Sequence, residues 1–445
     1  MPYLCIGAAR RWGIEALRYR TPNHILMKLK VLHTADWHIG QTFHRFERTY
    51  EHRLFLDWLL KTLSRESVDV LLLSGDVFDS YNPSAEAIGL FYAFLRDAVK
   101  ENPGIQIVTI AGNHDSAYRL EAPVPLLEGS RIHLIGAIER QADGTADYEK
   151  CIVPLLHQDG TVAAWCLAVP YLRTEVSRPQ AEDPEAIDPI DGVTGFYRET
   201  CRLVQNRRQE GQALLAMGHF HALHAEVTDL DKQERLVLGG LEGVPVRNFP
   251  AEIQYLALGH IHKAQAVGGD TTTCWYAGSP LPMSFTERAY QHQVLVFEIE
   301  DGQLSPPAAL PVPVSVPLRR IPAEPRPLEE VLQALQALES SADDLPPELY
   351  PYLQVMVRLD QPEPALRAKV EKALQDKAVR LTGIQVHYPA ATQTSGAEAT
   401  DTPSLRDLQP LTIFRSMYRK RFQSDPPESL SALFDDVLRS VQQNS

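Results

Sequence analysis

Three stretches decide the fold: KLKVLHTADWHIG at residues 28–40, VDVLLLSGDVFD at 68–79 and IQIVTIAGNHD at 105–115. Each begins with a run of strand-forming residues and ends in a polar loop rich in Asp, Asn, His and Gly. The second and third runs are continuously apolar, which is typical of strands buried on both faces. Residues 50–67 and 84–100 between them have helical patterns. This repeated strand–loop–helix order predicts an α/β sandwich or open sheet.

Further strands are expected downstream. Residues 150–157 and 161–169 are two apolar runs joined through an Asp-Gly pair, a pattern that indicates a β-hairpin. The stretches ALLAMGHFH (213–221) and YLALGHIH (255–262) indicate two more buried strands, each ending in a His cluster. The run QVLVFEIE (293–300) closes this region.

The composition changes after Leu304. Residues 306–327 hold many of the 33 prolines, which indicates a domain boundary crossed by an extended strand. A compact α+β unit is expected next, and residues 391–403 (ATQTSGAEATDTP) have the composition of a flexible linker. The expected elements of the α+β unit are a helix over 328–339, a strand over 352–359, a helix over 364–376 and a strand over 380–388.

The tail after the linker contains a predicted helix with one apolar stripe. Such a stripe needs a surface that buries it, and a groove on a partner protein is one solution. Packing onto the chain's own domain explains the stripe equally well. The stripe is formed by Leu430, Leu433, Phe434, Val437, Leu438 and Val441.

The overall composition is that of an ordinary globular protein, with 44% hydrophobic and 22% charged residues. No run of about 18 uncharged apolar residues occurs, so no membrane-spanning helix is expected. The five cysteines show no CxxC pairing, which favours reduced thiols and a cytoplasmic location. The net charge of −14 counts mildly against DNA binding by this chain alone, because duplex binding normally rests on Lys and Arg. A basic partner would remove that objection.

Residues 1–26 form an Arg-rich N-terminal extension with one acidic residue, Glu15. A transit peptide has this composition. An upstream extension from a misplaced start is the preferred interpretation, because Met27 already opens the first expected strand.

Residues of the types that bind metal ions follow five of the expected strands, in the motifs DWH, GDVFD, GNHD, GHF and GHIH. Ligands gather at the carboxyl ends of strands in open α/β sheets. Both ends of a DxH or HxH motif can face one site only where the chain already turns, and the flanking Gly permits such a turn. Each motif alone is more often a solvated loop or a satisfied core histidine. Five of them at consecutive strand ends instead favour a metal site.

This ordered set resembles the calcineurin-like metallophosphoesterase superfamily. Longer strings narrow the resemblance to the bacterial SbcD nuclease subunits, specifically over residues 28–300 and more loosely beyond. Those strings are LHTADWHIGQ (32–41), LLLSGDVFDS (71–80), VTIAGNHDS (108–116), VRNFPAE (246–252), YLALGHIHKAQ (255–265) and YAGSPLPMSFTE (276–287). The implied fold is an α/β metallophosphoesterase β-sandwich flanked by helices, with a smaller α+β capping domain and C-terminal helices. The implied domains are the nuclease domain (27–303), the capping domain (304–390), the linker (391–403) and partner-binding helices (404–445).

The resemblance implies a site for two divalent metal ions. The ligands are oxygen or imidazole nitrogen atoms, which suit Mn, Fe, Mg or Zn, and the family indicates Mn. One ligand bridges the ions, which requires a carboxylate with two oxygens. In this sequence Asp36, His38 and His262 would hold one ion, Asn113, His219 and His260 would hold the other, and Asp76 would bridge them.

His221 and His224 lie close to His219 and compete with it as the ligand. The preceding Gly and the family pattern favour His219. His114 is the candidate that protonates the leaving sugar oxygen, and Asp79 resembles the carboxylate that orients this His in related phosphatases.

Two further sets of residues have weaker interpretations. Asp115 is expected to have a turn or N-cap role. The group His44, Arg45, Arg48 and Arg53 could contact phosphate, and a solvated helix face explains it equally well.

The predicted function is that of a DNA nuclease subunit in an SbcCD-like complex. It would act as a 3'-5' double-strand exonuclease and single-strand endonuclease on DNA ends and hairpins in repair and recombination, with two Mn ions and a bridging hydroxide. An SbcC-like ABC-type ATPase partner would use ATP, because this chain has no GxxxxGK[ST] motif. Whether a homodimer forms, and the balance of exo- and endonuclease action, are left open.

Two alternatives remain: a small-substrate phosphodiesterase or phosphatase on the same fold, and an inactive DNA-end scaffold. The long region after residue 300 counts against the first alternative. The intact ligand set counts against the second.

Overall fold

The computed structural model describes residues 28–142, 144–172, 189–226, 243–268, 273–340 and 346–388, with a few positions of the tail. The chain divides into two compact units, Met1–His387 and Tyr388–Ser445. The N-terminal extension, the linker and most of the predicted apolar stripe lie outside the described residues. Only Leu430 and Phe434 of the stripe are described, and both are helical.

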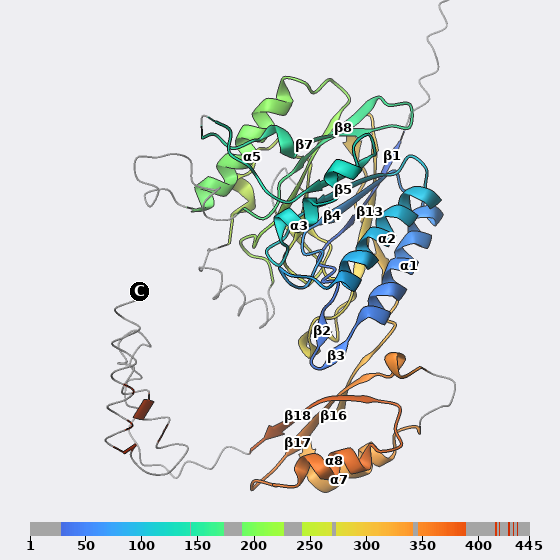
Figure 1. Ribbon diagram of the computed structural model, residues 1–445, viewed down its shortest axis with the longest axis vertical. Coiled ribbons are helices and arrows are strands. Elements are labelled where there is room, and N and C mark those ends of the chain that lie inside the picture. Colours follow the sequence, from blue (N-terminus) through green and yellow to red (C-terminus); the bar gives the residue numbers. More distant parts are fainter. Residues whose placement is uncertain are drawn as a thin grey trace, which may run out of the picture. The chain divides into compact units, whose positions relative to one another are not determined.

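The first sheet contains the three stretches that decide the fold (Figure 1). Its strands β1, β4, β5 and β6 are parallel, and β13 pairs antiparallel with β1. The order is β14-β13-β1-β4-β5-β6, with β15 also paired to β13. The bounds are β1 Leu29–Thr34, β4 Val70–Ser74, β5 Gln106–Ile110, β6 Ile132–Ile135, β13 Gln293–Glu300, β14 Gln303–Leu304 and β15 Ala308–Pro311.

The second sheet has the order β11-β12-β10-β9-β8-β7. Strands β7 and β8 form the expected antiparallel hairpin, and β8, β9, β10 and β12 run parallel. Its bounds are β7 Ile152–Leu156, β8 Val162–Ala168, β9 Ala213–His219, β10 Tyr255–Gly259, β11 Gln265–Val267 and β12 Thr273–Tyr276.

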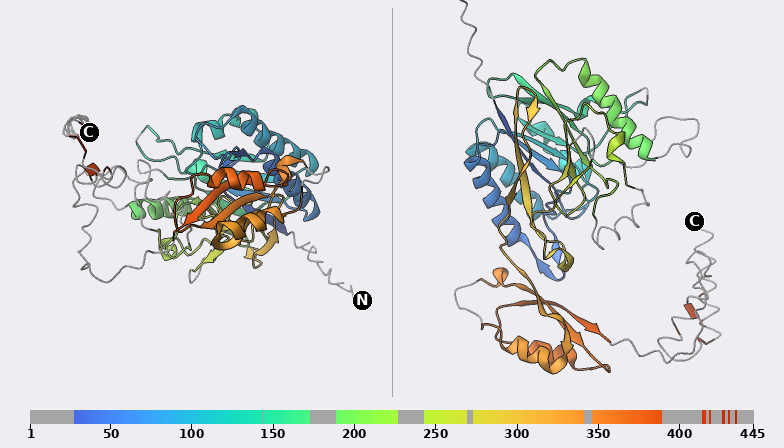
Figure 2. Two further views of the ribbon diagram at one scale, coloured as in Figure 1. Left: turned by 90° about the horizontal axis from the view of Figure 1, so that it is seen from below. Right: turned by 180° about the vertical axis from the view of Figure 1, so that it is seen from behind.

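The two sheets pack against each other, and helices flank them. One core cluster joins residues of β1, β4 and β5 to residues of β8, β9 and β10. A second cluster joins the other face of the first sheet to α1 (Thr49–Arg65) and α2 (Ala85–Glu101). Helix α5 (Pro189–Gln205) contacts β8 of the second sheet (Figure 2). The expected β-sandwich flanked by helices is therefore confirmed.

A smaller sheet follows, and we call residues 318–340 and 346–387 the cap. Strands β16 (Leu318–Pro327), β17 (Tyr352–Arg358) and β18 (Arg380–His387) are parallel. Helices α7 (Leu328–Gln336) and α8 (Leu366–Ala373) pack with them around a separate apolar core. The two helices and two strands expected here are confirmed to within a few residues, whereas the division into domains remains a prediction.

The remaining elements are short. They are strands β2 (Thr42–Phe43) and β3 (Phe46–Glu47), helix α3 (Ala117–Glu121), and 3-10 turns at Val124–Leu126, Glu149–Cys151, Val246–Asn248, Phe285–Glu287 and Pro347–Leu349. The four cysteines that the structure describes are free and buried, as expected. Within the described ranges, no helix combines the length and hydrophobicity that a bilayer crossing requires.

Candidate metal centre

Five strand ends supply the candidate ligands. In the first sheet, the DWH, GDVFD and GNHD motifs directly follow the carboxyl ends of β1, β4 and β5. In the second sheet, His219 ends β9 and His260 follows β10. Strand β10 pairs with β9, and both contact β4 across the sandwich. Parallel strands have their carboxyl ends at one edge, so the packed sheets bring all five motifs together.

The turns at these strand ends are made by the candidate ligands themselves. Asp36, His38, Asp76 and His260 have φ values of 54°, 47°, 48° and 93°, in the left-handed region. Non-glycine residues rarely adopt this conformation, and such strain clusters at functional sites. The expectation that the flanking glycines provide the turns holds for Gly40 and Gly75, whose φ values are 94° and 87°.

The other glycines serve close approach instead. A Cβ atom on Gly112 would lie 2.1 Å from Oδ1 of Asp76, and one on Gly259 would lie 1.9 Å from the Ser74 carbonyl oxygen. Neither clash could be relieved without moving a strand end or a candidate ligand. Gly259 therefore lets the two sheets approach each other at the site, and Gly112 lets the neighbouring strand ends of the first sheet do so.

Asp76 lies at the centre of the cluster and is 1% exposed. Its Oδ2 lies 3.2 Å from Nε2 of His219 and 3.7 Å from Nε2 of His38. Its Oδ1 accepts a 2.9 Å hydrogen bond from the backbone N–H of His114. Burial opposes ionisation, but the neighbouring imidazoles of His219, His38 and His114 together outweigh it and hold the pKa of the Asp76 carboxyl well below its usual range. Asp76 is therefore an ionised carboxylate with both oxygens directed into the site.

A second group surrounds the side-chain oxygen of Asn113. That oxygen lies 2.9 Å from Nε2 of His219 and 3.0 Å from Nδ1 of His260. The other nitrogen of His219, Nδ1, donates to the Ser74 carbonyl at 2.9 Å, which fixes the ring. Burial opposes protonation of His219, but Asp76 outweighs it and raises the pKa of the imidazole to about 9. Metal binding at this ring would therefore release a proton.

A third group contains Asp36, His38 and His262. Oδ1 of Asp36 accepts a 2.8 Å bond from the backbone N–H of His260, and the rings of His38 and His262 lie 5.2 Å apart. Burial raises the pKa of Asp36. Oδ2 of Asp36 and both ring nitrogens of His38 are buried without a hydrogen-bond partner. Buried polar atoms are almost always paired, so these donor atoms fit a cation.

The donor atoms form two tight groups that share Asp76. One group is Asp36, Asp76 and His219, the other is His38, Asp76 and His114, and in each the donor atoms lie within 4.8 Å of one another. A carboxylate common to both groups is what a bridging ligand requires. Neither group contains His221 or His224. The division of the seven ligands between two ions remains a proposal.

The contact between His114 and Asp79 differs in detail from the expected one. Nδ1 of His114 donates to the backbone carbonyl of Asp79 at 2.9 Å, and the Asp79 carboxylate instead lies 3.3 Å from Nδ1 of His38. The rings of His38 and His114 lie 4.9 Å apart. The backbone carbonyl of Asp79 therefore orients His114, and the side chain of Asp79 turns toward His38 instead.

Asp115 has a structural role. It is 1% exposed, and its carboxylate accepts hydrogen bonds from the backbone N–H groups of Gly112, Val77 and Phe78. Burial raises the pKa of Asp115 to about 6, and the charge on nearby Asp76 acts in the same direction. The bond to Gly112 agrees with the expected turn role, and the other two join that turn to the GDVFD loop.

Arg48 corrects an expectation, since both interpretations of the basic group placed it at the surface. It is 1% exposed and donates to Glu51, to Oε1 of Gln41 and to the Pro282 carbonyl. Glu51 also accepts a 2.5 Å bond from the hydroxyl of Tyr352 in β17 of the cap. We call Arg48, Glu51 and Tyr352 the cap junction. Charge neutralisation by Glu51 is the physical reason that Arg48 can be buried.

The rest of the basic group is more exposed. Arg53 pairs with Glu86 at the surface, which agrees with a solvated helix face. Arg45 donates to the Leu381 carbonyl of the cap.

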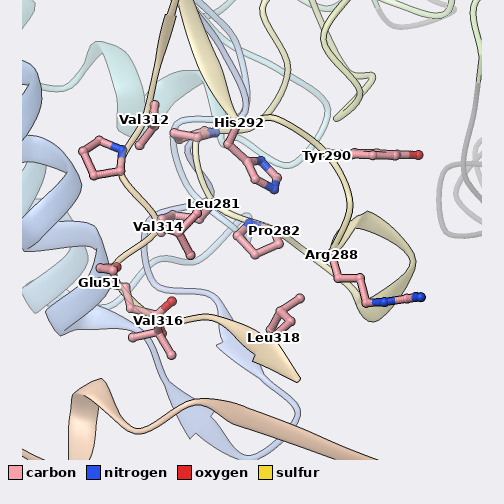
Figure 3. Close-up of a pocket in the computed structure, with 13 residues that line it drawn as sticks. Glu51, Leu281, Pro282, Arg288, Tyr290, His292, Val312, Val314, Val316 and Leu318 are labelled. Carbon is pink, nitrogen blue, oxygen red and sulfur yellow. The ribbon is translucent and has the colours of Figure 1, made fainter. Parts of the chain in front are cut away.

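A small cavity lies beside the cap junction, between the Pro280–Pro282 loop and residues 312–316 (Figure 3). Figure 3 shows Val312, Val314 and Val316 on one side of it, with Arg288 and Tyr290 extending from the other. Its volume is about 40 Å³, which suffices for a few water molecules and is far below that of a ligand site. The cavity is therefore not a second substrate site.

One neighbour of the ligands was not singled out from the sequence. Oε1 of Glu287 lies 3.3 Å from Nδ1 of His262, and Glu287 is 0% exposed. Burial would raise the pKa of Glu287, but the contact with His262 outweighs it and lowers that pKa. The sequence does contain a feature that points to Glu287: it is the single acidic residue in the mainly apolar string YAGSPLPMSFTE.

Comparison with known proteins agrees with this geometry. A family model described as calcineurin-like phosphoesterase matches residues 29–264, and a model described as type 5 capsule protein repressor C-terminal domain (SbcD_C) matches residues 314–422. The chain is 35% identical over 382 residues to the SbcD subunit of the nuclease SbcCD from Rhodobacter capsulatus, covering 84% of this chain and 91% of that protein. It is 32% identical to the SbcD protein of Escherichia coli K12, covering 65% of this chain and 70% of that one. The SbcD protein of Bacillus subtilis is 31% identical, with 62% and 67% covered. The chain therefore belongs to the SbcD family within the calcineurin-like phosphoesterases, and it is a metal-dependent phosphodiesterase of the nuclease type.

Proposed function

We propose that this chain is the DNA-cutting subunit of an SbcCD-like complex and uses two Mn ions. It acts as a 3'-5' exonuclease on double strands and as an endonuclease on single strands, and it processes DNA ends and hairpins in repair and recombination. The observation that carries the proposal is the convergence of five strand-end motifs: four supply the donor groups around Asp76, and the GHIH motif contacts those groups through Asn113, Asp36 and His38. The relatives, which are named as SbcD components of SbcCD nucleases, support the choice of substrate and complex.

The residues divide between two ions around one bridge. Asp36, His38 and His262 hold one ion, Asn113, His219 and His260 hold the other, and Asp76 contacts both. Two bound cations supply a water of lowered pKa as nucleophile and stabilise the charge that gathers on phosphorus. Oxygen and imidazole donors without thiolate are compatible with Mn.

His114 protonates the leaving sugar oxygen. Its Nδ1 donates to the Asp79 carbonyl, so Nε2 is the atom that carries the transferable proton when the ring is protonated. A proton delivered in the transition state contributes about 10²–10⁴-fold to a rate. The Asp79 backbone keeps this ring directed into the site.

The partners follow from the same proposal. DNA is the substrate, and an SbcC-like ABC-type ATPase binds the C-terminal residues and uses the ATP. The net charge of −14 makes a basic partner useful for holding DNA. The complex acts in the cytoplasm.

The test is degradation of linear duplex DNA by the purified chain with Mn, with and without the ATPase partner and ATP. The matched control is Asp76→Ala, since loss of the bridge removes several kcal/mol of transition-state stabilisation, a rate loss of about 10³-fold or more. Mn-dependent cutting that this variant loses, and that the partner enhances, supports the proposal. If DNA survives while a small phosphodiester is hydrolysed, the DNA substrate is wrong.

A further inference from the structure

We propose that Glu287 is a positioning residue for the metal centre: its carboxylate holds the His262 ring in the tautomer that presents Nε2 to the ion. The inference rests on the proposed ligand role of His262. Oε1 of Glu287 lies 3.3 Å from Nδ1 of His262, and the two residues are 0% and 3% exposed. An ionised carboxylate only accepts hydrogen bonds, so Nδ1 carries the proton and Nε2 keeps its lone pair.

The Glu287 carboxylate is itself held in place. Its other oxygen, Oε2, accepts a 2.7 Å bond from the backbone N–H of Met283. The backbone N–H of Glu287 donates to the Ser284 carbonyl at 3.1 Å, which closes the short turn Phe285–Glu287. Because both oxygens are engaged, the carboxylate is held in one orientation. It therefore holds the His262 ring in one orientation as well.

The neighbouring ligand His219 is oriented by a backbone carbonyl instead. Its Nδ1 donates to the Ser74 carbonyl at 2.9 Å. A carboxylate partner makes an imidazole more basic than a carbonyl partner does, and partners of this kind typically change metal affinity about 10–100-fold.

The turn that carries Glu287 is also tied to the body of the nuclease domain. Arg48 donates to the Pro282 carbonyl at 2.7 Å, one residue before Met283. Glu51 neutralises Arg48 at 2.8 Å. The position of the Glu287 carboxylate is thus fixed by buried contacts at the start of the turn.

The test compares Mn affinity and stoichiometry of the full chain, measured from the EPR signal of free Mn²⁺ during titration. Glu287→Gln keeps the size of the side chain, but its amide cannot accept from both Met283 and His262. We expect one of the two Mn ions to bind about 10–100-fold more weakly, with the other unchanged. Glu287→Asp, which shortens the side chain but keeps the charge, should recover part of the affinity.

The matched control is Ser284→Ala, which removes the hydroxyl that accepts from the Thr286 backbone in the same turn and leaves both Glu287 oxygens in place. It should bind both ions as the wild type does. Glu287→Gln with wild-type affinity, equal losses in both variants, or a wild type that binds no Mn would each overturn the positioning role. If the wild type binds two ions but cuts no DNA, only the proposed function fails, because the positioning role is measured by affinity alone.

Discussion

The metal centre and the cap junction both bury charged side chains, but they satisfy them differently. At the metal centre, Oδ2 of Asp36 and both ring nitrogens of His38 are buried without a hydrogen bond. At the cap junction, Arg48 makes hydrogen bonds to three residues, and Glu51 accepts from both Arg48 and Tyr352. The first region leaves candidate metal-ligand atoms unpaired, whereas the three side chains of the cap junction pair with one another.

This difference in pairing indicates that the metal centre serves metal binding and that the cap junction serves the stability of the fold. Buried polar atoms without a partner cost free energy unless something binds them. The metal centre is therefore arranged to bind metal ions, and this arrangement lowers the stability of the metal-free fold. The paired charges of the cap junction contribute little in net terms but are costly to break singly. Substitutions in the first region should therefore change metal binding or rate. Those at Glu51 and Tyr352 in the second should change the stability of the fold, and Arg48 also reaches the turn of Glu287 through the Pro282 carbonyl.

The largest expected effect is that of His114→Asn on DNA cleavage. Loss of the proton donor should lower the rate about 10²–10⁴-fold while both Mn ions remain bound. The measurements are single-turnover cleavage and Mn content by mass spectrometry. Because His114 lies in one of the tight donor groups with Asp76, loss of an ion in this variant would instead make it a ligand.

The next effect is that of Arg48→Met on stability. It removes the nearer charge partner of the buried Glu51 carboxylate, while Arg380 remains 3.7 Å from Oε1 of Glu51, so it should cost up to about 3–5 kcal/mol. Adding Glu51→Leu removes the stranded charge and should recover most of that loss. The measurement is the urea unfolding transition of each variant.

A surface pair provides the control for this comparison. Arg53 and Glu86 form an ion pair with side chains 57% and 56% exposed, so Arg53→Met should cost less than about 1 kcal/mol. Equal costs at Arg48 and Arg53 would show that the cap junction is not a buried network.

A smaller effect is expected for Tyr352→Phe. The substitution removes one hydrogen bond to the charged Glu51 and nothing else, so it should cost about 1.5–3 kcal/mol. Urea unfolding measures it, and Mn affinity should not change. Altered Mn affinity would mean that Tyr352, and not Arg48 alone, is coupled to the metal centre.

The smallest effect concerns pH. His52 lies between the two regions, with its ring nitrogens 3.0 Å from the backbone carbonyls of Arg48 and Trp37. Burial and the charge of Arg48 lower the pKa of His52 to about 4. The unfolded chain binds this proton near pH 6.5, so the contribution of neutral His52 to the free energy of unfolding is fully present above pH 6.5 and falls as the pH drops toward 4.

His52→Gln should therefore make stability less dependent on pH in that window. Urea midpoints at pH 7.5 and 5.0, measured with Mn for both proteins, give the difference. Identical slopes in the two proteins would show that His52 does not titrate in this way.

The two regions also differ in how far the sequence predicts them. The metal centre could be predicted because each motif is local: DWH, GNHD and GHIH each end an apolar run, and parallel strands bring their ends together. The cap elements were predictable from periodicity. The cap junction was not, because Tyr352 lies 301 residues from Glu51 and the segment around Arg48 is rich in charges that suggest a surface.

Within the metal centre, the sequence predicted which residues converge but not how they orient one another. The contacts of Asp79 with His38 and His114 depend on a left-handed turn at Asp76. The contact of Glu287 with His262 depends on a turn 25 residues away. Such contacts are tertiary, so no local pattern specifies them.

The most direct test of the account is a crystal structure of the chain with Mn, with the ions located by anomalous scattering. The account predicts two Mn peaks joined by the Asp76 carboxylate, one held by Asp36, His38 and His262 and the other by Asn113, His219 and His260. A single peak, or two ions that do not share Asp76, would contradict it.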